Sequence, residues 1–325
     1  MKFKQLIVLI SSFALLLSGC SSSSQERLEY TDTLFDTVIS VTLYDNSEKE
    51  VLEGCRDLCR NYDELFAKNN ENSDIYKINH AKGELVTVSD DTIALLEQGI
   101  YYSSLSKGAF DITIGSITNI WDFKSEKHSV PKDSEIDKAK AHVNYEGLIL
   151  QGNTVQLTDP NSMVDVGAVA KGYIADRLKD YLKSEGVEHA VINLGGNVQT
   201  IGSKPDGTDY NIGIQKPFDE SGAPITSVKI SDQSMVTTGI YQRYFELDGK
   251  LYHHILDPNT GYPCENNLYS VTIVTDSSLT ADALSTTCFL LGYEDGMRLI
   301  NELDGVEAVF ITDDNELHYS DNFQK

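Results

Sequence analysis

The stretch Thr280-Ala281-Asp282-Ala283-Leu284-Ser285-Thr286-Thr287 opens a helical pattern that runs over 278–302. Asp282, Ser285 and Thr286 are spaced i, i+3 and i+4, so a helix places all three on one face. One carboxylate and two groups with hydroxyl or carbonyl oxygens are hard donors, which suit Mg²⁺ better than zinc or copper. The alternative is structural, with Thr280 capping the helix and Asp282 in its positive first turn. The spacing alone leaves both interpretations open.

The rest of the chain mixes helix and strand patterns without regular alternation. Helical periodicity covers 47–66, 89–106 and about 168–184. Alternating or β-branched runs predict strands at 37–44, 147–150, 154–157, 189–193, 210–214, 227–231, 243–247, 250–256 and 268–275, and a final hairpin at 306–311 and 316–320. Asp248-Gly249 predicts a hairpin turn. We therefore predict an α+β fold rather than a doubly wound one.

A second group, Asp165-Val166-Gly167-Ala168-Val169-Ala170-Lys171-Gly172-Tyr173, stands where the third of these helices begins. Its small residues let a ligand approach the backbone, and a helix N-terminus attracts anions such as phosphate. Lys171 adds a full positive charge. The alternative is a packing corner with a solvated lysine. The pattern is not a P-loop, because the glycine spacing and the final Ser or Thr are missing.

Two further segments place polar residues in turn sequences. Asn193-Leu194-Gly195-Gly196-Asn197 either exposes amides to a ligand or forms an ordinary turn. His253-His254-Ile255-Leu256-Asp257-Pro258-Asn259-Thr260-Gly261 predicts a strand that ends in a turn. Strand alternation separates the two histidines, so one can act as a general base while the other packs or faces solvent. A purely structural histidine is the alternative.

The N-terminus predicts export. Lys2 and Lys4 precede an apolar run from Leu6 to Leu17, which is typical of a secretory signal and too short to span a membrane. Leu17-Ser18-Gly19-Cys20 resembles a bacterial lipobox, which implies cleavage before Cys20 and acylation of its thiol; the alternative is an uncleaved short anchor. The predicted divisions are a signal over 1–19, a lipidated cysteine and serine-rich tether over 20–27, and one globular unit over 28–325.

Charge and cysteine usage limit the possible partners. The 325 residues include 50 acidic and 26 basic side chains, a formal net charge of −24. This disfavours nucleic-acid binding and electrostatic adhesion to anionic lipid, and an anionic substrate would need a local cation. Export permits disulfides. Cys55 and Cys59 have an i,i+4 spacing that is poor for a disulfide, so we expect few or no bridges among them, Cys264 and Cys288.

Together these segments resemble the ApbE family of FAD:protein FMN transferases over most of the mature chain. The histidine–Asp-Pro–Thr-Gly and Ala-Asp-Ala-Leu-Ser-Thr segments are the most specific. Other matches are Gly108-Ala109-Phe110-Asp111-Ile112-Thr113, Ile214-Gln215-Lys216-Pro217 and Thr238-Gly239-Ile240-Tyr241-Gln242-Arg243-Tyr244-Phe245. The resemblance implies a T-fold-like α+β architecture of mixed sheets with flanking helices, a single unit that can divide into two lobes.

The resemblance also implies a role for each matching position. The magnesium ligands would be the Ala168 carbonyl, Asp282, Ser285 and Thr286. The residues that hold FAD would be Phe35, Asn69, Ala109, Phe110, Asp111, Asp165, Lys171 and Leu256. His254 matches the family's single histidine, whereas His253 is extra. We expect His254 to be the general base, with Asp257 orienting it or helping to bind the metal.

Three positions depart from the family pattern. Phe35-Asp36-Thr37 stands where the family usually has Met-Gly-Thr, so the apolar flavin contact is altered. Ile240 replaces a common acid, which leaves the adenine-side contacts open. Asn69 falls where many members carry a tyrosine beside the flavin, and members with asparagine there are linked to FAD hydrolysis.

The implied activity is Mg²⁺-dependent transfer of the FMN moiety of FAD to a threonine of exported acceptor proteins, with release of AMP. The alternatives are an FAD pyrophosphatase that gives FMN and AMP, and a flavin-binding lipoprotein without catalysis. Mg²⁺ and Lys171 would neutralise the pyrophosphate, which provides the local cation that an acidic chain needs. The expected partners are FAD, the acceptor protein, an FAD exporter and the membrane, through acylated Cys20. The expected location is the extracytoplasmic face of the bacterial cell membrane.

Overall fold

The computed structural model describes residues 27–45, 49–123, 128–219 and 221–324, so the predicted signal, Cys20 and nearly all of the tether lie outside the described residues. Its helices are α1 (Lys49–Phe66), α2 (Asp74–His80), α3 (Asp90–Leu105), α4 (Gly115–Thr118), α5 (Asp133–Lys140), α6 (Ala170–Ser184) and α7 (Ser278–Asn301), with a 3₁₀ turn η1 (Tyr145–Gly147). Its strands are β1 (Leu28–Leu34), β2 (Thr37–Leu43), β3 (Val86–Thr87), β4 (Leu148–Gln151), β5 (Thr154–Leu157), β6 (Ala190–Leu194), β7 (Asn197–Ile201), β8 (Tyr210–Gln215), β9 (Pro224–Ile230), β10 (Ser234–Gly239), β11 (Tyr244–Leu247), β12 (Lys250–His253), β13 (Leu268–Thr275), β14 (Glu307–Thr312) and β15 (Leu317–Tyr319).

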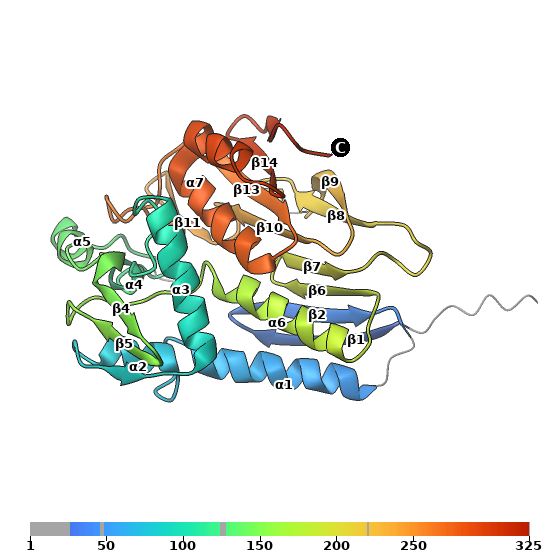
Figure 1. Ribbon diagram of the computed structural model, residues 1–325. Helices are drawn as coiled ribbons and strands as arrows, with labels where there is room; N and C mark the ends of the chain where they lie inside the picture. The colour runs from blue at the N-terminus through green and yellow to red at the C-terminus, as the bar shows by residue number, and fades with distance from the viewer. Residues whose placement is uncertain (1–26, 46–48, 124–127, 220, 325) are drawn as a thin grey trace, which may run out of the picture.

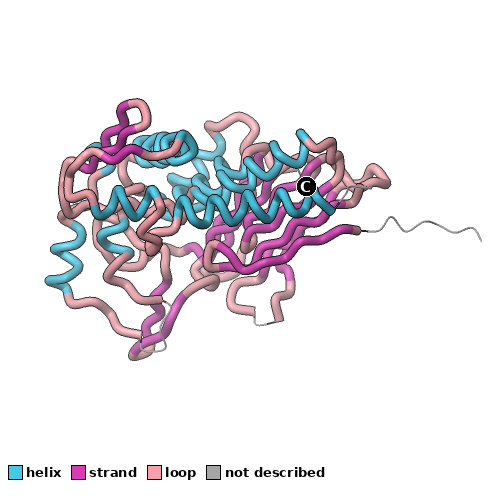
Figure 2. Tube along the Cα trace, turned by 90° about the horizontal axis from the view of Figure 1, so that it is seen from below, coloured by secondary structure: helices cyan, strands magenta, loops and turns pink. Residues whose placement is uncertain are grey.

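An eight-stranded sheet in the order β1-β2-β6-β7-β10-β13-β14-β15 forms the centre of the molecule. Its strand pairs are antiparallel. Helices α6 and α7 pack on one face of this sheet, and α1 lies beside α6 and β1 (Figure 1). Figure 2 shows the long helices on one side of the strands. This helical face contains the largest core cluster, to which Val236, Val271 and Phe289 belong.

The hairpin of β8 and β9 covers the opposite face of the sheet at β10, β13 and β14. Ile214 and Val228 of the hairpin pack there with Met235, Val274 and Ile311 of the sheet. These three strands are therefore buried on both faces. Such burial makes this part of the sheet a rigid platform for residues at its ends.

A smaller lobe adjoins one end of the large sheet. It contains the three-stranded sheet β3-β5-β4 together with α2, α4 and α5 (Figure 1). A separate core cluster joins Ile117, Trp121 and Ile136 of this lobe to Phe245 and Leu256 of the hairpin β11–β12 and the turn that follows it. The hairpin is therefore fastened to the smaller lobe by apolar packing.

The prediction of an α+β fold is confirmed, and most predicted elements appear within two or three residues of their expected bounds. The strand predicted over 250–256 is too long, because β12 ends at His253. Strands β7 and β10 were not predicted. Both contain buried polar side chains, among them Gln199 and Ser234, so their sequences lack a clear apolar pattern. Strand β1 and helices α2 and α5 were also not predicted.

The described cysteines Cys55, Cys59, Cys264 and Cys288 are free thiols, in line with the expectation of few disulfides. Burial raises the pKa of the Cys55 and Cys59 thiols to about 12, which makes both unreactive at neutral pH. Among the described helices, none combines the length and apolarity needed to cross a membrane.

Candidate active site

The face of α7 presents its predicted oxygen donors together. Thr238, at the end of β10, lies with its Oγ1 2.7 Å from Ser285 Oγ and 3.0 Å from Thr286 Oγ1. Ser285 Oγ also donates to the Asp282 carbonyl at 2.9 Å. Thr238 belongs to a segment that matches the family, but its place beside α7 follows only from the packing of α7 on β10.

The capping alternative for Asp282 is not what the structure shows. Ser277 is the N-cap of α7, and its side chain accepts from the Thr280 N–H at 3.2 Å. Asp176 supports the same end by accepting from the Ser278 and Leu279 N–H groups at 2.8 and 3.0 Å. Asp282 lies beyond the first turn, so its carboxylate is not needed to stabilise the helix end.

Asp282 joins α7 to the start of α6. Its carboxylate is 3% exposed, with Oδ1 3.5 Å from Lys171 Nζ and Oδ2 accepting from the Gly172 N–H at 2.9 Å. Burial raises the pKa of Asp282, while Lys171 and the Gly172 N–H oppose this rise. A buried carboxylate with so few partners favours a cation beside it.

The loop before α6 has features of both alternatives that its sequence suggested, a ligand site and a packing corner. A Cβ on Gly172 would lie 2.4 Å from the Ser278 carbonyl oxygen, so glycine is required for α6 to approach α7. Lys171, however, is not a solvated lysine. Its Nζ also donates to the Gly167 carbonyl at 3.3 Å, and so stands between this loop and Asp282.

The carbonyl of Ala168 is available as a ligand. The Gly172 N–H, which would normally close the first turn of α6 on this carbonyl, donates to Asp282 instead. Within the described residues no backbone N–H donates to Ala168. A free carbonyl, a buried carboxylate and two hydroxyls form an oxygen donor set that fits Mg²⁺. Among the described residues, no three His, Cys, Asp or Glu side chains lie close enough together to hold one metal ion, as a zinc site of the common type would require.

His254 is held as a neutral base. Its Nδ1 lies 3.1 Å from the Arg243 carbonyl, which only accepts, so the ring proton must be on Nδ1 and the Nε2 lone pair is free. Burial, then the Arg243 guanidinium, with smaller contributions from His253 and Lys171, lowers the pKa of His254 to about 4.

The neighbouring His253 is structural. It is 6% exposed, and its Nε2 lies 3.2 Å from the Cys264 carbonyl. Burial lowers the pKa of His253 to about 4 as well. The two histidines therefore diverge as predicted, although His254 follows the end of β12 rather than lying within a strand.

Asp257 and Leu256 stabilise the turn after β12. Asp257 Oδ1 accepts from the Asn259 N–H at 2.8 Å, and the Asp257 carbonyl accepts from the Gly261 N–H at 2.8 Å. The group that hydrogen-bonds the His254 ring and orients it is thus the Arg243 carbonyl rather than Asp257. Leu256 is 3% exposed within the core cluster of the smaller lobe. The catalytic role of Asp257 and the cofactor contact of Leu256 stay predictions.

The residues expected to hold FAD fall into two groups. Asp165 lies in the loop that leads into α6, three residues before Ala168. Its Oδ2 accepts from Thr118 Oγ1 at 2.6 Å and lies 3.8 Å from Lys68 Nζ. Asp111 is 6% exposed and accepts from the Thr113 N–H and hydroxyl at 2.7 and 2.6 Å and from the Tyr145 N–H at 3.0 Å. Asp165 thus lies in the same loop as the Ala168 carbonyl. Both Asp111 oxygens instead organise the loop that also contains Ala109 and buried Phe110.

Phe35 and Asn69 lie in turns. Phe35 has a φ of 55°, unusual for a bulky residue, and its N–H donates to Asp63 Oδ1 at 3.0 Å. Asn69 is exposed in the turn that follows α1. The turn Gly195-Gly196 lies near Phe35, because a Cβ on Gly195 would meet Thr37 Oγ1 at 2.3 Å. Both glycine amides bond within the protein, to Val38 and Asn193, so this segment is an ordinary turn.

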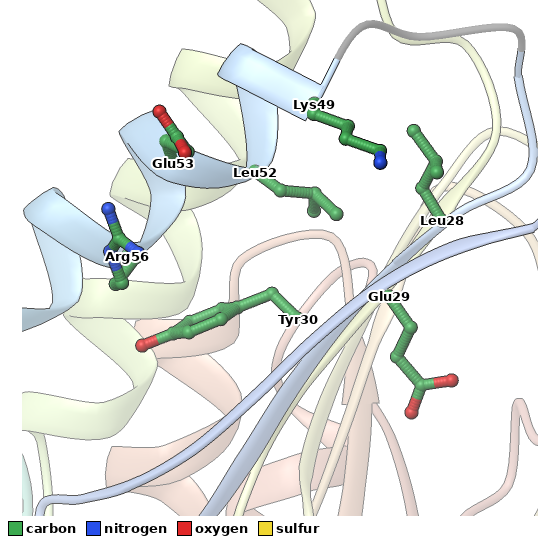
Figure 3. Close-up of a pocket in the computed structure, with 7 residues that line it drawn as sticks. All are labelled: Leu28, Glu29, Tyr30, Lys49, Leu52, Glu53 and Arg56. Atoms are coloured by element: carbon green, nitrogen blue, oxygen red, sulfur yellow. The ribbon is translucent and has the colours of Figure 1, made fainter.

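A surface hollow of about 220 Å³ lies elsewhere, between β1 and α1 (Figure 3). It is lined by Leu28, Glu29, Tyr30, Lys49, Leu52, Glu53 and Arg56. None of the predicted site residues lines it. The hollow is open and is lined by both acidic and basic side chains. It has no group of oxygen donors like the one around Asp282.

Buried oxygen donors, a lysine and a neutral histidine on separate elements have the form of an enzyme active site for an anionic substrate. The chain belongs to the ApbE family, whose sequence model matches residues 35–310. It is 39% identical to an FAD:protein FMN transferase of Klebsiella pneumoniae strain 342, over 91% of this chain and 92% of the relative. A Treponema pallidum protein of the same name is 33% identical, over 83% and 79% of the two chains.

Solved structures show the same fold. The ApbE protein of Thermotoga maritima superposes with a TM-score of 0.85 at 29% identity, covering 92% of this chain and 98% of that one. The flavin transferase ApbE of Vibrio cholerae gives a TM-score of 0.81 at 28% identity, with the same coverage of both chains.

Proposed function

We propose that this protein transfers the FMN moiety of FAD to a threonine hydroxyl of an acceptor protein and releases AMP, with Mg²⁺ bound. Membership of the ApbE family and similarity to proteins named FAD:protein FMN transferase support flavin transfer. The observation that carries the chemistry is the neutral His254, whose Nδ1 bonds the Arg243 carbonyl and leaves Nε2 to take a proton, together with the buried Asp282 beside Lys171.

The proposed step is a substitution at the FMN phosphorus. The threonine Oγ forms a bond to this phosphorus, the phosphoanhydride bond breaks, and AMP leaves with the bridging oxygen. His254 Nε2 takes the hydroxyl proton, as a general base does. The Arg243 carbonyl holds the opposite ring nitrogen and keeps the lone pair directed. Lys171 offers a positive charge to the pyrophosphate.

The residues that would hold Mg²⁺ are Asp282, Ser285, Thr286 and the Ala168 carbonyl. Bound there, the ion would neutralise charge on the pyrophosphate. Asp282 gives the site its only negative charge among these four groups. Thr238 keeps both hydroxyls in place through its bonds of 2.7 and 3.0 Å. The support is the donor chemistry and the unpartnered Ala168 carbonyl.

FAD pyrophosphatase activity is the second candidate. It would use the same residues with water in place of the threonine. Asn69 favours it, because the family resemblance links asparagine at this position to FAD hydrolysis, and its side chain, exposed after α1, would leave more room for water than a tyrosine. The proposed contacts of FAD with Phe35, Asn69, Ala109, Phe110, Asp165 and Leu256, and with the loop that Asp111 organises, apply to both activities.

One experiment separates the two activities. The chain from Ser21 onward is incubated with FAD, Mg²⁺ and a candidate acceptor domain, AMP is followed by chromatography and the acceptor by intact mass. A mass gain of FMN minus water, matched by AMP and abolished by EDTA, supports transfer to protein. AMP with free FMN and no mass gain, repeated with an unrelated second acceptor, supports the pyrophosphatase instead.

The location is also a proposal. The basic and apolar start of the chain and Leu17-Ser18-Gly19-Cys20 support a lipid anchor on the extracytoplasmic side of the membrane. The acceptor would then be an exported protein, and FAD would need an exporter. Expression of the full chain and of Cys20→Ala tests this: the wild type should fractionate with membranes and label with palmitate, and the variant should do neither. An unlabelled wild type would contradict the proposal.

A further inference from the structure

A partly exposed aromatic patch lies close to the proposed base along the chain. It is formed by Phe218, Tyr241, Tyr244 and Tyr269. The ring centroid of Phe218 is 6.0 Å from that of Tyr241, 5.5 Å from that of Tyr244 and 5.3 Å from that of Tyr269. Phe218 is 39% exposed and Tyr244 is 40% exposed. A contiguous aromatic surface of this kind marks an interaction site more often than scattered apolar residues do.

The backbone connects this patch directly to His254. Tyr244 follows Arg243, whose carbonyl binds both the His254 N–H and Nδ1 at 3.1 Å. Tyr244 is also the cross-strand partner of His253 in the hairpin β11–β12. The Arg243 backbone therefore joins the patch to the group that would take the acceptor's proton.

Phe218 is held at the surface by a strained backbone. Its φ of 57° lies in the left-handed region, which a bulky side chain rarely adopts. The segment is tied to the site by Tyr241, whose hydroxyl donates to the Gln215 carbonyl at 3.5 Å. Strain of this kind persists where surrounding contacts enforce it, and it is concentrated at functional sites.

The charges around the patch are unusual for this chain. Lys216 and Arg243 are both exposed, and neither forms an ion pair within the described residues. The nearby Asp219 carboxylate accepts from the Ser221 N–H and hydroxyl at 2.8 and 2.5 Å, and Lys216 is among the groups that lower its pKa, so part of the Lys216 charge is offset there. In a chain with 50 acidic and 26 basic residues, two exposed basic side chains beside partly exposed aromatic rings complement an acidic partner.

We propose that the aromatic patch, with Lys216 and Arg243, docks an acidic, extended segment of the acceptor protein and so presents its threonine to His254. This inference rests on the proposed transferase function. Tyrosine and arginine are enriched among the residues that dominate binding at protein interfaces, and tyrosine offers a large contact area at a low entropic cost.

The test compares the Michaelis constants for the two substrates. The probe is an acceptor domain that the wild-type protein modifies, as judged by intact mass. Phe218→Ser and Tyr244→Ser should each raise KM for this domain by about tenfold, with KM for FAD and kcat little changed. Lys216→Glu should raise the same constant by less, and the wild-type KM should rise with salt. Tyr101→Ser is the matched control, since Tyr101 is 53% exposed on α3 and outside the patch.

Each outcome decides one question. If the wild type modifies no acceptor, the proposed function fails and this inference fails with it. If the wild type transfers FMN and the patch variants keep the wild-type KM for the acceptor, the docking inference is overturned and the function stands. A rise in KM for FAD instead would assign the patch to the cofactor. Thermal melting of each variant, and Phe218→Leu as a milder change, separate docking from loss of folding.

Discussion

Asp282 and Asp111 are both buried carboxylates whose pKa is raised by burial, yet their surroundings differ. Asp111 accepts three hydrogen bonds from neutral donors of its own loop and of residue 145. Asp282 accepts one backbone N–H and faces a lysine at 3.5 Å, next to hydroxyls and a free carbonyl. His254 and His253 repeat the contrast, since His253 is buried against the Cys264 carbonyl whereas His254 bonds the Arg243 carbonyl through Nδ1 and leaves Nε2 to take a proton. Similar burial therefore serves structure in one region and chemistry in the other.

The largest expected effect comes from Asp282→Asn. This change removes the only carboxylate of the donor set, so we expect about a thousandfold loss of AMP release at fixed Mg²⁺, since a metal ion provides several kcal/mol of charge stabilisation. The free energy of unfolding should change by less than about 1 kcal/mol, because relief from burying a charge offsets the lost ion pair. Chemical denaturation and AMP chromatography measure both. Normal turnover at low Mg²⁺ would contradict the ligand assignment.

His254→Ala should lower the transfer rate by about 10²- to 10⁴-fold, because a general base typically contributes this much. KM for FAD should stay near the wild-type value. His253→Gln is the matched control, and its rate should stay within a few fold of the wild type, because His253 faces the Cys264 carbonyl rather than the site. Equal losses in the two variants would erase the proposed distinction between the histidines.

Thr238→Val tests whether the hydroxyls of α7 need support. The change removes the Oγ1 that bonds Ser285 and Thr286, and groups that orient metal ligands commonly contribute about ten- to a hundredfold in metal affinity. We therefore expect the Mg²⁺ concentration for half-maximal rate to rise by at least about tenfold. Thr238→Ser keeps the hydroxyl and should restore the wild-type value. A Mg²⁺ titration that is identical in all three proteins would show that Thr238 has no such role.

Asp111→Asn should have the smallest effect on rate and a clear effect on stability. An amide nitrogen would face donors that now bond a carboxylate oxygen, so the free energy of unfolding should fall by about 2 kcal/mol. The rate per folded molecule and KM for FAD should be retained. A raised KM for FAD without loss of stability would favour the cofactor role implied by the family resemblance.

Acid should destabilise the protein through both histidines. Each has a folded-state pKa of about 4, below its usual value of 6.5, so the unfolded chain binds more protons between these values. The contribution of the two neutral histidines to the free energy of unfolding is complete above pH 6.5 and is lost as the pH falls towards 4. His253→Gln should reduce the slope of unfolding free energy against pH in this window. An unchanged slope would mean that other groups dominate.

Much of the site was predictable because its residues are neighbours along the chain. The i, i+3 and i+4 spacing placed Asp282, Ser285 and Thr286 on one helical face, and the structure has that helix at Ser278–Asn301. Strand alternation separated His253 from His254. The hairpin turns at Asp248-Gly249 and 313–315 also follow from local backbone preferences.

Other features depend on contacts between distant segments. Lys171 meets Asp282 across 111 positions, Thr238 meets Ser285 across 47, and His254 takes its orientation from a main-chain carbonyl. A carbonyl is present at every residue, so no side-chain pattern identifies the one at Arg243.

The amino-acid sequence was enough to predict the four longest helices, several turns, the family resemblance and the chemical types of the site residues, because these depend on short-range geometry and residue identity. Packing between distant segments determines that Asp282, unlike Asp111, lies beside a lysine and further oxygen donors, which threonine supports the α7 hydroxyls, and where partly exposed aromatic rings gather near His254. These features arise when α6 and α7 pack on the sheet and the β11–β12 hairpin packs against the smaller lobe.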